Sequence, residues 1–200
     1  MDTFHLRTGS HVPLSEKLHE GYRLSEHSLI ANVSAEKMLP LLSDFIVSHD
    51  EPLFFILELP TNQEKEAKLL AENISHFHKD IYYIDGCSQE KAQDILQHIG
   101  ALLCNDGLCS FGYGAHISGD EIMVEKYNVI SAFSRNMTAL TNIFEKQNIF
   151  PVKTLVTAWD TFSSDFPGHS ETIETGGKTV YDIPDMYAAQ GMYFAQRRED

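Results

Sequence analysis

The 200-residue chain carries 29 acidic residues against 15 lysines and arginines, which gives a formal net charge of -14 at pH 7. Its apolar fraction of 42% is enough for a substantial core, and this excludes a disordered chain. A surface with this much negative charge repels phosphate backbones and anionic lipid. Neither nucleic acid nor a membrane is therefore expected as a partner. A cationic protein would be attracted to it, although the acidity could also serve only solubility.

The first residues contain no basic segment followed by an apolar run, so no signal peptide is predicted. The longest apolar stretches, such as 53–57, are far too short to span a membrane. We therefore expect a soluble, cytoplasmic protein with reduced thiols at Cys87, Cys104 and Cys109. The segment from Cys104 to Cys109 resembles half of a zinc site, but no second ligand pair follows, so a tight turn between two core cysteines is predicted instead.

The N-terminal third of the chain predicts an irregular lead-in, a strand and a helix. Residues 1–20 are polar with weak periodicity, and residues 22–33 predict a strand that the polar segment 25–28 could interrupt. Ser34 then provides an N-cap for a helix. Its apolar positions follow the spacing i, i+3, i+4, i+7 at Met38, Leu41, Leu42 and Phe45.

The middle of the chain alternates strands and helices. Consecutive apolar residues at 53–57 predict a central strand covered on both faces. A surface helix is expected over 63–77, and a short strand over 81–84 that Asp85 and Gly86 would end. Ser88 opens the most regular helix, whose apolar stripe is Ala92, Ile95, Leu96, Ile99, Leu102 and Leu103.

An antiparallel hairpin is expected next. Residues 110–117 alternate apolar side chains with small or polar ones, which predicts a half-buried strand with one nearly bare face. A turn at 118–120 leads into a long returning strand over 122–133, and a third helix follows at about 136–147.

The C-terminal quarter is predicted to hold a strand, a loop and a helix. Residues 154–159 indicate the last strand, and 163–178 are rich in Ser, Thr, Gly and acids, which is typical of a mobile loop. Pro184 would begin a final helix. That helix could form a homodimer face from Tyr187, Met192, Tyr193 and Phe194.

Together these elements predict a single α+β domain over residues 1–200. We expect a mixed sheet of about five to six strands, including the hairpin, flanked by about four helices. A weak similarity among the three capped helices leaves open a diverged internal repeat.

The sequence contains no motif for catalysis, for a cofactor or for a metal, so none of these is predicted. The most plausible catalytic pair is Cys87 with His116 as its base. Cys87 would lie at the N-terminus of the helix from Ser88, where its pKa would fall and its reactivity rise. The alternative is a cysteine that only packs in the core.

Four further residues are candidates for binding. Glu58, Asp85 and Asp160 each follow an apolar strand, and open sheets commonly form sites at the carboxyl ends of their strands. Trp159 lies beside Asp160 and precedes the predicted loop. It suits either a protein-binding hot spot or the core.

Three functions remain open, the last of them a structural or regulatory module that self-associates through the predicted C-terminal helix. The first is a non-enzymatic, acidic, intracellular binding protein that neutralises a cationic protein partner. In charge, size and absence of catalytic motifs the chain is similar to small acidic inhibitors of secreted toxins, particularly bacterial immunity proteins. The second is a small-molecule enzyme with a site at the strand ends that uses Cys87, His116 and nearby carboxylates.

Overall fold

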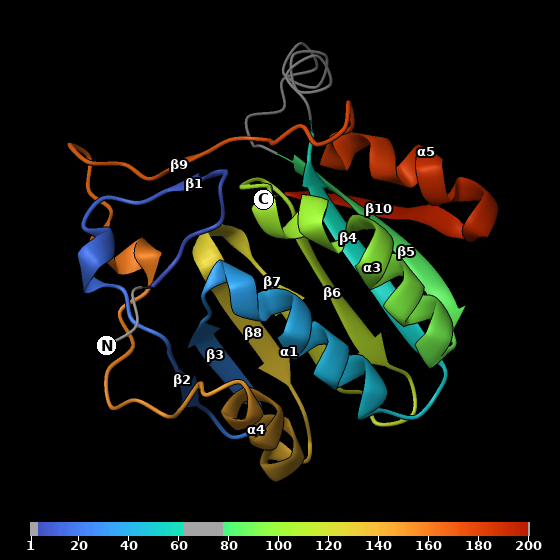
Figure 1. Ribbon diagram of the computed structural model, residues 1–200, viewed down its shortest axis with the longest axis horizontal. Coiled ribbons are helices and arrows are strands. Elements are labelled where there is room, and N and C mark those ends of the chain that lie inside the picture. Colours follow the sequence, from blue (N-terminus) through green and yellow to red (C-terminus); the bar gives the residue numbers. More distant parts are fainter. Residues whose placement is uncertain (1–3, 62–77, 200) are drawn as a thin grey trace.

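A computed structural model describes residues 4–61 and 78–199. It shows an α+β fold built on a sheet of eight strands in the order β10-β5-β4-β6-β7-β8-β3-β2, with a two-stranded sheet of β1 and β9 at one side (Figure 1). The strands are β1 (Ser10–His11), β2 (Gly21–Leu24), β3 (Ser28–Asn32), β4 (Leu53–Pro60), β5 (His78–Cys87), β6 (Ser110–Ala115), β7 (Glu121–Val124), β8 (Val129–Phe133), β9 (His169–Ser170) and β10 (Met192–Glu199). The predicted class is confirmed, although the strands exceed the expected five to six and every neighbouring pair in the large sheet is antiparallel.

The helices lie on one side of the large sheet. In the described ranges they are α1 (Ala35–Val47), α3 (Gln89–Asn105), α4 (Met137–Lys146) and α5 (Ile183–Tyr187). Figure 1 shows α1, α3 and α4 in front of the sheet, and α5 contributes Ile183 and Tyr187 to the same core. None of the helices in the described residues is both long enough and apolar enough to cross a membrane.

The three predicted helix starts are confirmed. Ser88 Oγ accepts a hydrogen bond from the Lys91 amide at 3.1 Å, and Asn136 Oδ1 accepts one from the Ala139 amide at 3.2 Å. Such caps satisfy amides that the first helical turn leaves unpaired. Ser34 also precedes α1, but its hydroxyl accepts from the His5 amide instead of from the helix. The predicted helix over 63–77 lies outside the described residues.

Strand β4 presents two different faces. Leu53, Phe55, Leu57 and Leu59 are buried against the helices. Phe54, Ile56 and Glu58 point to the opposite side, which we call the open face because no described helix covers it. The predicted central strand is therefore confirmed. Among the described residues its second face is covered by neighbouring side chains of the sheet, since Ile56, Ile81 and Met123 form a small cluster with Phe54 and Tyr83.

Strand β6 does not have the bare face that its glycines suggested. A Cβ placed on Gly114 would lie 2.0 Å from the Phe54 ring, and one on Gly112 would lie 2.7 Å from the Met123 sulfur. These two side chains therefore fill the space over the glycines. The expectation of a bare face was wrong because it considered the strand without its neighbours.

The predicted returning strand over 122–133 is two strands. The chain turns back at Tyr127 and Asn128, which adopt left-handed φ angles of 58° and 64°. The side-chain Nδ2 of Asn128 donates to the carbonyls of His5 and Val33, and its Oδ1 accepts from the backbone amide of Arg7 at 2.9 Å. Asparagine tolerates this conformation better than most residues, and the N-terminal segment holds it in place. The interruption expected at 25–28 is confirmed as the β2–β3 turn.

Strand β5 continues past the point where Asp85 and Gly86 were expected to end it. A register shift between Leu53 and Phe55 marks a bulge in the β4–β5 pairing, and Gly86 adopts a φ of 64°. A bulge accommodates one extra residue and bends the strand without ending it.

The C-terminal helix predicted from Pro184 is mostly a strand. Helix α5 and a 3-10 turn end at Gly191, whose φ of 97° is left-handed, and β10 then pairs with β5. Met192, Tyr193 and Phe194 belong to this strand, so the helical dimer face does not exist. Glycine ends a helix at low cost, and pairing with β5 decides the rest.

The strand predicted over 154–159 was also wrong. Residues 158–161 form a 3-10 turn instead, and the Asp160 carboxylate accepts from the Thr157 amide and hydroxyl at 2.8 and 2.9 Å. Residues 163–178 are irregular except for β9, and their mobility stays a prediction. The lead-in is irregular as expected, apart from β1 and a short 3-10 turn at 15–17.

The turn predicted between two core cysteines is confirmed. Cys104 and Cys109 are buried and free, and they flank Asp106, which is fully buried. One carboxylate oxygen of Asp106 accepts from the amides of Leu108 and Cys109. The other accepts from the Thr172 hydroxyl and the Ile173 amide, so a single side chain joins the end of α3 to the segment that follows β9.

Candidate functional site

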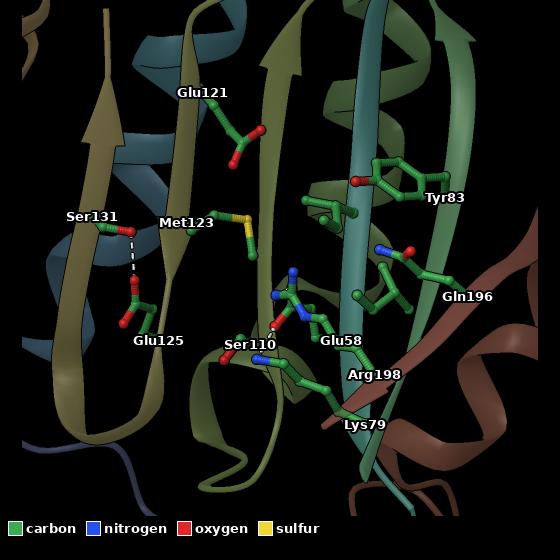
Figure 2. A pocket seen from close by; sticks show the side chains of 12 residues that line it. Glu58, Lys79, Tyr83, Ser110, Glu121, Met123, Glu125, Ser131, Gln196 and Arg198 are labelled. Carbon is green, nitrogen blue, oxygen red and sulfur yellow. Dashed lines mark hydrogen bonds and ion pairs between the residues drawn. The ribbon is translucent and has the colours of Figure 1, made fainter. Parts of the chain in front are cut away.

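The open face is hollowed into a cavity of about 480 Å³ (Figure 2). Its floor is apolar, formed by Ile56, Ile81 and Met123. The other lining residues are polar or aromatic and come from β4, β5, β6, β7, β8 and β10: Glu58, Lys79, Tyr83, Ser110, Glu121, Glu125, Ser131, Gln196 and Arg198. The cavity is therefore mainly polar, with converging polar groups around a small apolar base.

At one end of the cavity the charges are paired. The Glu58 side chain, 8% exposed, accepts from Lys79 Nζ at 2.7 Å and from Arg198 Nη2 at 2.5 Å. A carboxylate this buried requires such partners, because an unpaired charge would be strongly destabilising. Glu58 is therefore largely neutralised from within the chain.

The opposite end holds a carboxylate without such a partner. Glu121 lies across the cavity from Lys79 (Figure 2), and within 4–61 and 78–199 no group donates a hydrogen bond to it. Burial raises the pKa of Glu121, and the nearby Glu58 charge raises it further, while Arg198 acts in the opposite direction. Glu125, which directly follows β7, also lines the cavity, but it accepts a hydrogen bond from the Ser131 hydroxyl. Glu121 is thus the carboxylate best placed to receive a cation from outside.

Tyr83 faces the same space from β5. Burial raises the pKa of its phenol, and the charges of Glu121 and Glu58 add to this effect. No hydrogen bond from a described residue reaches its hydroxyl. Two polar groups that receive no hydrogen bond from a described residue, the Tyr83 hydroxyl on β5 and the Glu121 carboxylate on β7, therefore face one cavity.

A row of rings crosses the open face beside this cavity. Tyr193, Tyr83, Phe54 and His116 follow one another across β10, β5, β4 and the end of β6, with centroid separations of 6.3, 5.7 and 5.0 Å. We call these four residues the aromatic row. Asp85 lies at its edge, where its carboxylate accepts from the Tyr193 hydroxyl at 2.5 Å and lies 3.2 Å from His116 Nε2. The hydrogen bond to Asp85 raises the pKa of Tyr193.

The predicted binding residues do not form one site at the strand ends. Glu58 and Asp85 both lie on the open face, but near opposite ends of it, because β4 and β5 are antiparallel. Carboxyl ends of strands meet at one edge only when the strands are parallel. Asp160 caps the 3-10 turn at 158–161, and Trp159, 52% exposed, packs edge-on against Tyr127 and Phe162.

The structure places Cys87 and His116 on opposite faces of the sheet. Cys87 is fully buried in the main core, and its thiol donates to the Ile84 carbonyl at 3.4 Å. His116 packs on Phe54 at the open face. Burial raises the pKa of the Cys87 thiol, and the Lys91 charge offsets this rise only in part, so the pKa is raised where the sequence suggested a depressed value.

The burial of Cys87 predicts low thiol reactivity. In the folded protein we expect Cys87, Cys104 and Cys109 to react with Ellman's reagent at pH 8 at least about 100-fold more slowly than after unfolding in urea. Burial raises all three pKa values, that of Cys104 to about 12, so the reactive thiolate is scarce at this pH. One thiol that reacts rapidly in the folded protein, removed by Cys87→Ser, would contradict the core placement.

Sequence reasoning missed Glu121, Tyr83 and Arg198. Glu121 and Tyr83 come together through the strand order β5-β4-β6-β7, and Arg198 through the pairing of β10 with β5, so the sequence offered no local spacing that joins the three residues. The sequence offered one signal for Glu121: it is an acidic residue directly after the turn at 118–120. In the hairpin it is paired with Gly114 of β6, so it lies on the same face as the glycines of that strand.

Comparison of the chain with models of protein families, with curated proteins and with solved structures finds no match. The fold and the site therefore have to be interpreted from their own chemistry. They define an α+β protein whose antiparallel sheet is covered by helices on one side and presents an acidic, partly aromatic cavity on the other.

Proposed function

We propose that the protein binds a cationic protein partner through its open face, as a binding protein and not as an enzyme. The observation that carries this proposal is Glu121, a partly buried carboxylate that no described residue pairs with. Its raised pKa indicates that the ionised carboxylate is disfavoured in the free folded protein. A cation supplied by a partner would offset that cost and add a charge-assisted hydrogen bond.

The charges around the cavity support a cationic partner. Three carboxylates line it, those of Glu58, Glu121 and Glu125, against the two cations Lys79 and Arg198. The chain as a whole carries a formal charge of -14. A positively charged protein would be steered toward such a surface, and the excess carboxylate in the cavity would give it a place to dock.

The aromatic row supports a protein as the partner. Exposed aromatic side chains are enriched at protein interfaces, where rigid rings bury much area at low entropic cost. Tyr193 is 46% exposed and lies beside the cavity. An inhibitor of the immunity type, acting in the cytoplasm on a cationic toxin, is one form of this proposal.

The observations favour binding over the alternative of a small-molecule enzyme. That alternative relied on Cys87 as nucleophile and His116 as base. The nucleophile lies in the core on the helix side, and the base lies on the open face, so the two do not share a substrate site.

The proposal predicts that capture of a partner depends on Glu121. Immobilised wild-type protein should retain basic proteins from a lysate of the source organism and release them with salt. Retention by Glu121→Gln should fall about 10- to 100-fold, because removing one member of a desolvated charge pair weakens binding strongly. Glu90→Gln, which removes one exposed charge from α3 on the helix side, should change retention less than about twofold.

Mass spectrometry of the eluates identifies the proteins that the wild type and Glu90→Gln retain and that Glu121→Gln loses. If the wild type retains no basic protein, or if Glu121→Gln retains it as well as the wild type and Glu90→Gln do, the proposal is wrong.

The thermal stability of Glu121→Gln shows whether this variant is folded. Because the pKa of folded Glu121 is raised, its ionisation costs stability as pH rises through that pKa, so Glu121→Gln should melt at the same or a higher temperature at pH 7.

A further inference from the structure

We infer that the cationic group bound in the cavity is the guanidinium of an arginine, held between the Glu121 carboxylate and the Tyr83 hydroxyl. This inference rests on the proposed function, because it names the partner group that the open face recognises. It draws on the two groups that no described residue hydrogen-bonds, on the apolar floor of the cavity, and on the guanidinium that the chain itself already places there.

The first argument is the position of the two acceptors. Glu121 on β7 and Tyr83 on β5 are separated by β4 and β6, which places their strands about 14 Å apart at the usual strand spacing. Their side chains face the same cavity, and the Glu121 charge acts on the Tyr83 phenol. A ligand that satisfies both must present donors in more than one direction. A guanidinium has five donors in a fixed plane, whereas an ammonium is a compact point charge.

The second argument is the floor. Ile56 on β4 is paired with Tyr83, and Met123, two residues from Glu121 on β7, covers the glycine strand β6 at Gly112. An arginine carries three methylene groups that can pack on such a surface while its head reaches the polar rim. Its guanidinium is also less strongly hydrated than an ammonium, so it loses less on leaving water.

The third argument comes from Arg198. Its Nη2 atom donates to Glu58 Oε1 at 2.5 Å in the same cavity, and Arg198 lies on the terminal strand of the sheet. The cavity therefore already accommodates one guanidinium against a carboxylate. Glu121 offers a second carboxylate of the same kind at the other end, with no occupant from the described chain.

A titration followed by NMR tests the inference without a known partner. N-acetyl-arginine amide is added to the 15N-labelled protein, and N-acetyl-lysine amide is the matched probe. We expect the arginine probe to shift backbone signals of β5, β6 and β7 around Tyr83, Gly112 and Glu121, with a Kd of about 1–10 mM. It should bind about fivefold more tightly than the lysine probe.

Variants separate the two contacts. Glu121→Gln should weaken the arginine probe at least about 10-fold, and Tyr83→Phe, which removes only the hydroxyl, about threefold. Glu90→Gln should leave binding unchanged. Equal affinity for both probes, shifts outside the open face, or an unchanged affinity in Glu121→Gln would overturn the inference.

The outcomes of this titration differ from those of the capture experiment. If a basic protein is retained through Glu121 but the arginine and lysine probes bind alike, the partner is cationic and the choice of arginine is wrong. If the arginine probe binds as expected but no basic protein is retained, the site exists and the proposed protein partner is wrong.

Discussion

Replacing Phe55 by alanine is expected to lower the free energy of unfolding by about 3–5 kcal/mol. Phe55 lies at the centre of the sheet, where it is fully buried and aligned between Ile84 of β5 and Tyr113 of β6. Its ring lies 5.3 Å from that of Tyr113. Removing it leaves a cavity that the surrounding strands and helices cannot fill, and urea denaturation followed by circular dichroism measures the loss.

The neighbouring residue provides a matched comparison. Phe54 carries the same side chain on the same strand, but it lies partly exposed on the open face. Phe54→Ala should therefore cost only about 1–2 kcal/mol, mainly from uncovering Gly114 and Tyr83. Equal losses for the two variants would mean that the two faces of β4 are covered alike, which contradicts the open face.

The second large effect is expected at Asp106. Asp106→Ala should lower the free energy of unfolding by about 3 kcal/mol or more, because four donors lose their acceptor and the Cys109 amide among them is buried. Two of these donors belong to the turn after α3, and two to the segment after β9. Urea denaturation gives the size of the loss, and hydrogen exchange should show faster exchange at Ile173 and Cys109.

A control from the same irregular region separates this effect from the loss of any charge. Asp165 is exposed, and Asp165→Ala should change the stability by less than about 0.5 kcal/mol. If Asp106→Ala behaves like Asp165→Ala, then the carboxylate does not join the two segments as the structure indicates.

Local patterns predicted α1, α3 and α4 well. Each of α1, α3 and α4 has a regular apolar stripe, and the starts of α3 and α4 also have a capping side chain, all within one stretch of chain. The central position of β4 followed from its consecutive apolar residues. These features depend on neighbours in sequence, so they could be inferred before any topology was known.

Features that depend on distant pairing were missed. The turn at Tyr127 and Asn128 is held by the N-terminal segment, and β10 exists because residues 192–199 pair with β5. The apolar spacing after Pro184 is compatible with a helix, and only Gly191 hinted at its end. Tertiary pairing decided the structure where local preference was weak.

The candidate site was predicted only in part. Glu58 and Asp85 do lie on the open face, but they were chosen by a rule for parallel strands that this sheet does not follow. Glu121 and Tyr83 come together through the order β5-β4-β6-β7, which the sequence alone does not specify. The sequence left open whether the Cys87 thiol is reactive or packs in the core, because its burial could not be judged from the helix start beside it.

The most direct test of the account measures the affinity of the captured basic partner for wild-type protein and for Glu121→Gln over a range of salt concentrations. We expect wild-type affinity to fall at least about 10-fold between about 0.05 and 0.5 M NaCl, since salt screens the attraction. Glu121→Gln should bind about 10-fold more weakly at low salt and depend less on salt. Equal affinity of the two proteins at every salt concentration would contradict binding through the open face.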